Sequence, residues 1–461
     1  MNTTQQHSEV MKFNAKARWN LFGSAIYEGL RIAHNTILAI LFTPQVFGLV
    51  GSLFASTFLV VRLSDAGATN TLLPFFGYLE RSQHTFKSFF VRRLLLPLFI
   101  TAPIGAGLAS IFLHTTDHKT LASCAVILPL LIFSETVRSF LRQFLHLAGQ
   151  SKQTVLTDHI TFCAYVLVCW PILFFVPSMR TPFFVFALFL VDSLIGMGSF
   201  LVLTLRFAKT LPLTTTYEPE PPLRNFYLAR LYAWLMRICK ELFSSNALTP
   251  LFAATVGLKQ AGLFYFAATL AMALHAMMRS VIGYAGASFF ISARKASMPA
   301  AHAFTLVSQK LSSILLVLIS FFILSYHDIA KLTHATAAPS QLTIFFVLYF
   351  AIVVIEFTLL LYEQQYQFEQ AGAKALQWRA LELILVYVTT RGLVSFQPAP
   401  ALGCILLAKT GTLIALALSG YRRWGIHLSW RMPIRKVLAL VSISLGLSLF
   451  FKIVVYALLR P

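Results

Sequence analysis

Apolar stretches long enough to cross a membrane alternate with short polar connections along almost the whole chain. A membrane-crossing helix needs about 20 mostly apolar residues, and the first half of the chain contains six such segments. They lie near residues 19–42, 46–77, 90–113, 121–146, 155–176 and 183–207. The pattern predicts an N-terminal lobe of six helices over residues 19–210, after a polar cytoplasmic tail over residues 1–18.

A polar, proline-rich run over residues 211–225 interrupts this pattern and predicts a cytoplasmic linker, because such a run is unsuited to hydrocarbon. Six further apolar segments follow near residues 226–250, 260–292, 301–326, 341–370, 375–396 and 400–421. They predict a C-terminal lobe over residues 226–425, and a last apolar run predicts an extra transmembrane helix over residues 434–459. The fold class is therefore an all-α polytopic membrane protein with two six-helix lobes.

The two lobes resemble each other when the sequence is aligned with itself at an offset of roughly 215 to 223 residues, which is typical of transporter folds. Residues 47–49 then match residues 261–263, and residues 148–150 match residues 371–373. Glu135 also falls opposite Glu356. The same order of landmarks in both halves predicts lobes related by pseudo-twofold symmetry.

Composition agrees with a membrane location, since 57% of the 461 residues are hydrophobic and only 11% are charged. Little length remains for a separate soluble catalytic domain. The sequence contains no phosphate-binding glycine loop, no zincin helix and no nucleophile elbow. The five cysteines are scattered singly and predict neither disulfides nor a metal site. We therefore expect a transporter rather than an enzyme, with no cofactor.

The formal net charge of +21 comes from 37 Lys and Arg against 16 Asp and Glu. In a soluble protein this excess would suggest a nucleic-acid partner. Here most basic residues fall in alternate loops, as the positive-inside rule requires. The charge therefore predicts no nucleic-acid partner but a multi-pass plasma (inner) membrane protein with a cytoplasmic N-terminus.

Several charged residues lie far from the ends of the predicted helices, where each costs on the order of 2.5 to 3.5 kcal/mol on insertion scales. They are either neutralised structural pairs or the lining of a cavity. Basic residues outnumber acids in four of these helices, which favours a positive cavity between the lobes. The candidate substrate-binding residues are Arg31, Arg62, Arg237, Lys240 and Arg279. The candidate supporting or ion-coupling residues are Glu28, His34, Asn35, Asp65, Glu241 and His275.

Other charged residues in the apolar segments predict peripheral roles. Arg138 and Arg142 lie near the inner end of the fourth segment, where long basic side chains reach the lipid headgroups. Arg391 and Lys409 either line an outward cavity or pair with Glu382. We do not rank these four residues with the candidate site.

Three short motifs carry a resemblance to a known family. They are Pro44 with Phe47 and Gly48 before the second helix, residues 63–68 late in that helix, and residues 141–149 around the loop after the fourth. Over residues 15–425 the chain resembles the polysaccharide flippases, which belong with the multidrug and lipid II exporters in one superfamily. The resemblance implies a V-shaped pair of lobes that alternates between inward-open and outward-open states. The extra helix departs from the twelve-helix pattern.

Proteins similar to this one move lipid-linked oligosaccharides, whose pyrophosphate is anionic and suits the forked donors of arginine. The resemblance thus implies a polyprenyl-pyrophosphate-linked glycan as substrate, with membrane lipids and enzymes of polysaccharide biosynthesis as partners. The membrane potential alone could drive an anionic headgroup outward, so coupling to protons or sodium stays open.

Two alternatives also stay open. A multidrug exporter of the same architecture would present acids, and Asp65, Asp192, Glu241 and Glu356 are available. A membrane glycan polymerase would need an acid or an arginine on a substantial outer loop, but the longest outer connection, residues 326–341, is short.

Overall fold

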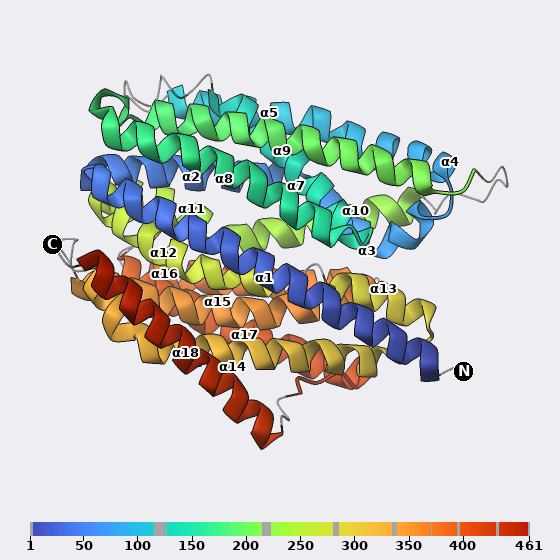
Figure 1. Cartoon of the computed structure of the whole chain (residues 1–461). Helices are drawn as coiled ribbons and strands as arrows, with labels where there is room; N and C mark the ends of the chain where they lie inside the picture. The colour runs from blue at the N-terminus through green and yellow to red at the C-terminus, as the bar shows by residue number, and fades with distance from the viewer. Residues whose placement is uncertain are drawn as a thin grey trace.

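The computed structural model describes residues 3–114, 124, 127–213, 223–279, 285–333, 339–369, 371–393, 397–429 and 433–459, in which all regular elements are helical (Figure 1). The first lobe contains α1 (Thr3–Leu41), α2 (Pro44–Ser64), α3 (Ala68–Leu79), α4 (Gln83–Thr85), the π-helix η1 (Phe86–Leu95), α5 (Leu96–His114), α7 (Ile127–Leu147), α8 (Ser151–Phe175), the short 3-10 helix η2 (Pro177–Met179) and α9 (Pro182–Thr210). The second contains α10 (Leu223–Glu241), α11 (Ser245–Val256), α12 (Leu258–Arg279), α13 (Ala287–Lys295), α14 (Ala300–Thr333), α15 (Pro339–Phe368), α16 (Gly372–Leu393), α17 (Pro398–Trp424) and α18 (Ile434–Leu459).

The long helices run side by side in two bundles, one above the other in Figure 1. In the upper bundle α7 packs on α5 and α9, and in the lower bundle α15 packs on α17 and α12. The bundles meet where α2 crosses α11 and α12 and where α1 lies against α12. We call the end of the molecule at which α1 begins the N-end, and the opposite end, where α1 finishes and α2 begins, the C-end.

Helix α1 begins much earlier than the apolar pattern suggests. Residues predicted to form a polar tail continue the helix back to Thr3. Phe13 is buried in this extension and its ring stacks on that of Phe289, with centroids 4.7 Å apart. The extension therefore packs α1 against α13 of the second lobe. Most of the predicted linker, residues 214–222, lies outside the described residues.

The lobes approach each other most closely where α2 crosses α12 near the C-end. A β-carbon on Gly48 would overlap the carbonyl oxygen of Leu258, and one on Gly262 would lie 3.1 Å from the Cα atom of Gly48. These two glycines occupy matching positions in the internal repeat. Their contact across the lobe interface is expected if the lobes are related by a twofold axis that passes between them.

The segment predicted as one helix over residues 46–77 is broken in the middle. Ala66 and Gly67 have positive φ angles of 46° and 77°. The carboxylate of Asp65 accepts hydrogen bonds from the backbone N–H groups of Gly67 (2.8 Å) and Thr69 (3.3 Å), so it caps the helix that follows. A β-carbon at position 67 would also collide with the carbonyl oxygen of Arg230 in α10. Glycine is thus required both by the backbone conformation and by the neighbouring helix.

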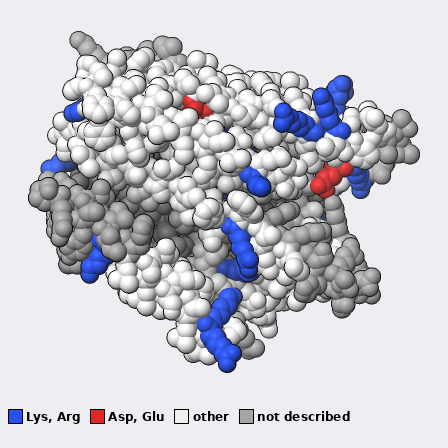
Figure 2. Space-filling model, in the orientation of Figure 1, with Lys and Arg blue, Asp and Glu red and all other residues white. Residues whose placement is uncertain are grey.

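Seven segments of the described chain are long and apolar enough to cross a membrane on those criteria alone: Pro44–Leu79, Gln83–Gly105, Ser151–Phe175, Pro182–Thr210, Ala300–Ser325, Ser340–Phe368 and Pro398–Trp424. Helices such as α7 and α16 run alongside them but carry buried charged residues, which lowers their apolar character. Uncharged side chains cover most of the face in Figure 2, where acidic side chains are scarce. The fold is that of a polytopic membrane protein.

Candidate transport cavity and buried ion networks

A cavity of about 270 Å³ lies between the lobes, and α1, α2, α7, α8 and α12 provide most of its lining. It extends from the middle of these helices to the N-end, close to the last turns of α7 and α12. Its basic lining residues are six arginines, Arg31, Arg62, Arg138, Arg142, Arg237 and Arg279. Its acidic lining residues are Glu28, Asp65, Glu135 and Asp158.

Aromatic side chains also line the cavity. They include Tyr27, Phe54, Phe58, Phe162, Tyr165, Phe189 and Tyr265. Many of these rings contact one another, as Phe54 and Phe189 do with centroids 5.4 Å apart. Arg62 and Arg279 lie on the last turns of α2 and α12, whereas Arg31 follows Tyr27 on α1. The lining therefore combines guanidinium groups with a cluster of packed aromatic rings.

Helix α1 places a polar stripe against this cavity because Glu28, Arg31 and Asn35 recur at helical spacing. Arg31 and Glu28 form an ion pair of 2.8 Å within the helix. The Arg31 side chain is 33% exposed and the Glu28 side chain only 5%. Both residues line the cavity, and the arginine is the more exposed of the two.

His34 also lines the cavity, and its partners define its tautomer. The indole N–H of Trp170 donates to Nδ1 of His34 over 3.1 Å, and Nε2 lies 3.0 Å from the hydroxyl of Tyr165. Because an indole nitrogen can only donate, Nδ1 must accept, so the neutral imidazole carries its proton on Nε2. His34 is therefore held as a hydrogen-bonded structural residue in this conformation, which weakens the case for ion coupling.

Two ion pairs connect α2 to α10 across the lobes. Arg62 binds Glu241 over 2.7 Å, and Arg237 binds Asp65. Arg62 and Arg237 both line the cavity, as predicted for substrate-binding residues. Lys240 does not line it and instead contacts acidic residues inside the second lobe.

The remaining candidates are divided between the cavity and the undescribed part of the chain. Arg279 lines the cavity at its N-end, on the last described turn of α12. Asn35 lines the cavity and is buried. His275 belongs to α12, but its side chain lies outside the described residues. The same holds for the side chain of Arg391 in α16.

Arg138 is the centre of a buried network in the first lobe, so the prediction that it reaches the lipid headgroups is wrong. It contacts Glu135 (3.1 Å), Asp158 (3.2 Å) and Asp192 (2.7 Å), and it is 3% exposed. Helix α9 makes room for it with a glycine, since a β-carbon at Gly196 would lie 2.5 Å from Nε of Arg138. Three carboxylates offset the cost of burying the guanidinium better than distant headgroups would.

Arg142, one turn further along α7, extends the same network. Its side chain is 28% exposed and lies 3.5 Å from Asp158. The predicted headgroup contact is wrong for this residue too, because it lines the cavity rather than the outside of the lobe.

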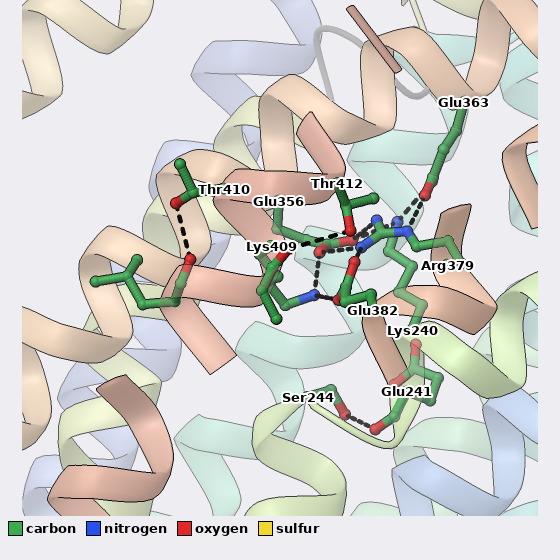
Figure 3. A network of polar contacts seen from close by, with 12 residues as sticks. Lys240, Glu241, Ser244, Glu356, Glu363, Arg379, Glu382, Lys409, Thr410 and Thr412 are labelled. Atoms are coloured by element: carbon green, nitrogen blue, oxygen red, sulfur yellow. Dashed lines mark hydrogen bonds and ion pairs between the residues drawn. The ribbon is translucent and has the colours of Figure 1, made fainter. Parts of the chain in front are cut away.

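The second lobe contains a similar network around Arg379, shown in Figure 3. This arginine contacts Glu356 (2.7 Å), Glu363 (2.5 Å) and Glu382 (2.8 Å), and its side chain has no exposed surface. Two lysines complete the network. Lys409 contacts Glu356 (2.5 Å) and Glu382 (3.0 Å), and Lys240 contacts Glu356 (3.0 Å) and Glu363 (3.3 Å). Of the two roles considered for Lys409, pairing with Glu382 is confirmed.

The two networks occupy corresponding helices but take their central arginine from different ones. Glu135 of α7 and Glu356 of α15 match in the internal repeat, and each binds the central arginine of its lobe. That arginine comes from α7 in the first lobe but from α16 in the second. Apart from the pairing of Lys409 with Glu382, sequence reasoning missed both networks. The available signal was an opposite charge three residues away inside an apolar segment, as in Glu135 with Arg138 and Arg379 with Glu382.

Burial of acids also changes the predicted charge of the cavity. Among the described residues nine Asp and Glu side chains are buried, namely those of Glu28, Asp65, Glu135, Asp158, Asp192, Glu241, Glu356, Glu363 and Glu382. The cavity lining has six arginines and four acids. Asp192 and Glu241, which do not belong to the lining, bind two of these arginines, Arg138 and Arg62. The predicted surplus of positive charge is therefore balanced by acids in this conformation. The arginines remain the cavity-facing members of several pairs.

This geometry defines a class of protein: two helical bundles around a polar, interlobe cavity, which is the architecture of a polytopic membrane transporter. No protein-family model and no curated protein sequence matches the chain. Solved structures are similar in fold. An outward-facing multidrug resistance MATE family transporter of the MOP superfamily has a TM-score of 0.64 and 15% identity, covering 90% of this chain and 96% of that chain.

Two other solved structures extend the comparison. A eukaryotic MATE transporter has a TM-score of 0.63 and 12% identity, with 95% of this chain and 100% of that chain covered. A MOP superfamily transporter from Pyrococcus furiosus has a TM-score of 0.59 and 11% identity, with 90% of this chain and 96% of that chain covered. For that protein, a reverse polarity of the binding pocket suggests a different function. At these identities the comparisons define the fold, that of the MATE-like transporters of the MOP superfamily.

Proposed function

We propose that this protein is a flippase that exports an anionic lipid-linked oligosaccharide by alternating access, with the polyprenyl tail left in the lipid. The observation that carries the proposal is the interlobe cavity with six arginines in its lining. Guanidinium groups donate pairs of hydrogen bonds to phosphate oxygens, and this chemistry suits a pyrophosphate. The aromatic rings of the lining offer faces for stacking of the attached sugars.

The size of the cavity implies that it widens during transport. At about 270 Å³ it is slightly smaller than the roughly 300 to 1,000 Å³ of ordinary ligand pockets. It has room for a phosphate-bearing group but not for a whole oligosaccharide. The lobes must therefore separate to admit the glycan, as alternating access requires. An inside-negative potential drives negative charge outward, and this movement releases about 2.3 kcal/mol per charge per 100 mV.

The test combines export with insertion. Arg31→Ala, Arg62→Ala and Arg279→Ala should each abolish export while the protein still inserts at normal levels, because each removes a cavity-facing donor. Arg206→Ala, on an exposed position of α9 outside the cavity lining, is the matched control. Deletion of the protein should accumulate a lipid-linked glycan on the cytoplasmic side, identified by mass spectrometry. Retained complementation by all three cavity variants would reject the proposal.

A cation-coupled multidrug exporter is the second candidate, and the fold similarity to multidrug transporters favours it. The acids considered for that role each bind a basic group: Asp65 binds Arg237, Asp192 binds Arg138, Glu241 binds Arg62 and Glu356 binds Arg379. This pairing leaves less negative charge for a cationic drug. Efflux of a cationic dye by reconstituted protein, without any effect of an anionic lipid-linked glycan, would favour the drug exporter.

A further inference from the structure

Two side chains of α10 donate hydrogen bonds to backbone carbonyl groups at the end of α2 and in the turn that follows it. The last carbonyl groups of a helix lack N–H partners within it. Here Trp234 Nε1 donates to the carbonyl oxygen of Leu63 (3.0 Å), and Arg230 Nε donates to that of Ala66 (2.9 Å). The end of a first-lobe helix is thus capped by side chains of the second half of the chain.

The ion pairs Arg62–Glu241 and Arg237–Asp65 lie next to this cap and cross between the same two helices. In each pair the arginine is the more exposed partner. The Arg62 side chain is 26% exposed against 4% for Glu241, and that of Arg237 is 12% exposed against 5% for Asp65. A ligand in the cavity therefore meets more of each guanidinium group than of its carboxylate partner.

A phosphate-bearing ligand and these carboxylates compete for the same donors. Both are oxyanions that accept paired hydrogen bonds from a guanidinium group, but a pyrophosphate carries more charge. When the ligand takes the arginines, Asp65 and Glu241 lose counter-ions while they are buried, which is unfavourable unless they gain access to water. Separation of α2 from α10 would provide that access.

We propose that the pairs Arg62–Glu241 and Arg237–Asp65 form a lock between the lobes that an anionic ligand opens by replacing the carboxylates. The proposal rests on the anionic substrate class proposed above and adds how its binding is coupled to lobe movement. Arg31–Glu28 differs because both residues belong to α1, so its exchange separates no helices.

Lys240 determines which way α10 moves when the lock opens. It lies beside Glu241 in the chain but contacts Glu356 and Glu363 of α15. Figure 3 shows Lys240 within the network around Arg379, whereas the Glu241 side chain binds Arg62 of α2. Because the ligand does not reach Lys240, α10 stays attached to the second lobe while its contacts with α2 break.

The test measures the distance between the lobes with spin labels and uses inorganic pyrophosphate as the probe. Labels at Lys209→Cys in α9 and His302→Cys in α14 report on the N-end, in the full-length chain with its native cysteines replaced by alanine. With Asp65 and Glu241 intact, pyrophosphate should shift the distances to longer values. Asp65→Asn with Glu241→Gln should give the longer distances without pyrophosphate, since both arginines lose their counter-ions. The amide oxygen of Asp65→Asn still accepts the shorter hydrogen bond, from the N–H of Gly67, and only the longer bond from Thr69 is lost.

Two further variants keep the outcome decisive if the neutral double variant fails to fold. Arg206→Ala, at an exposed position of α9 outside the cavity lining, should behave like the unmodified chain. Arg62→Glu with Glu241→Arg reverses one pair and should keep the short distance but lose most of its response to pyrophosphate. A neutral double variant that is folded and keeps the short distance would overturn the lock.

Pyrophosphate binding, measured by calorimetry, separates this inference from the proposed substrate class. Binding without any change in distance would overturn the lock and leave the anion site in place. No binding, together with long distances in the neutral double variant, would overturn the anionic substrate and its role as the trigger, while the ion pairs would remain an interlobe contact.

Discussion

Replacement of Arg379 by methionine should strongly destabilise the second lobe. The buried network contains three acids, Glu356, Glu363 and Glu382, against Arg379 and two lysines. Arg379→Met keeps much of the side-chain volume but leaves three carboxylates with two cations. Removal of one partner from a buried ion pair costs about 3–5 kcal/mol because the other charge is left uncompensated. We expect a loss of that size in the free energy of unfolding.

The magnitude can be tested by restoring the charge balance. Glu363 contacts Arg379 (2.5 Å) and Lys240 (3.3 Å), so Arg379→Met with Glu363→Gln leaves two acids with two lysines. The double variant should recover a large part of the lost stability, although Glu363→Gln alone should be destabilising. Denaturant titration of the purified variants in detergent gives the free energy of unfolding of each. The three differences from the unmodified chain form a double-mutant cycle.

Two results would refute this reasoning. Arg379→Met could prove as stable as the unmodified chain, which would mean that the carboxylates are neutral without their partner. Alternatively, the two changes could be additive, which would mean that charge balance does not determine the cost. Arg138→Met in the first lobe is a comparison, since it leaves three carboxylates with Arg142 alone and should be at least as damaging.

Two further predictions concern the contact between α2 and α12 at the C-end and the tautomer of His34. Gly48→Ala should reduce transport with little loss of insertion. The added methyl group would overlap the carbonyl oxygen of Leu258 and keep α2 from closing on α12. Normal transport rates in vesicles would contradict this prediction. Trp170→Phe should free Nδ1 of His34 and give a mixture of tautomers, while the unmodified chain shows the Nε2–H form alone. Nitrogen NMR of labelled histidine distinguishes the two, and a mixture in both proteins would contradict the assignment.

The apolar periodicity of the sequence was sufficient to predict the all-helical membrane fold, because burial in lipid requires helices whose backbone groups bond internally. It placed most helices within a few residues of their observed positions. It did not predict the break at Asp65 to Gly67, where a positive φ angle and a neighbouring helix decide the conformation. It also underestimated α1, since the helical extension to Thr3 is polar and its burial depends on contacts with α13.

For the candidate site, the sequence indicated which charged residues lie at membrane depth, and Arg31, Arg62, Arg237 and Arg279 do line one cavity. It could not show what each charge contacts, because the partners are far apart in the chain. Lys240 and Glu241 are adjacent, yet one binds Glu363 in the second lobe and the other binds Arg62 in the first.

The sequence by itself determined the number and sign of the charges and the helices that carry them. Only the tertiary structure decided how they are paired. Among the described residues it buries nine acids, six of them beside arginines at least 16 positions away in sequence, and these acids balance the arginines that they contact. The physical reason is that a charge in a low-dielectric interior is stabilised by its nearest neighbours in space, and those neighbours are set by helix packing rather than by position in the chain.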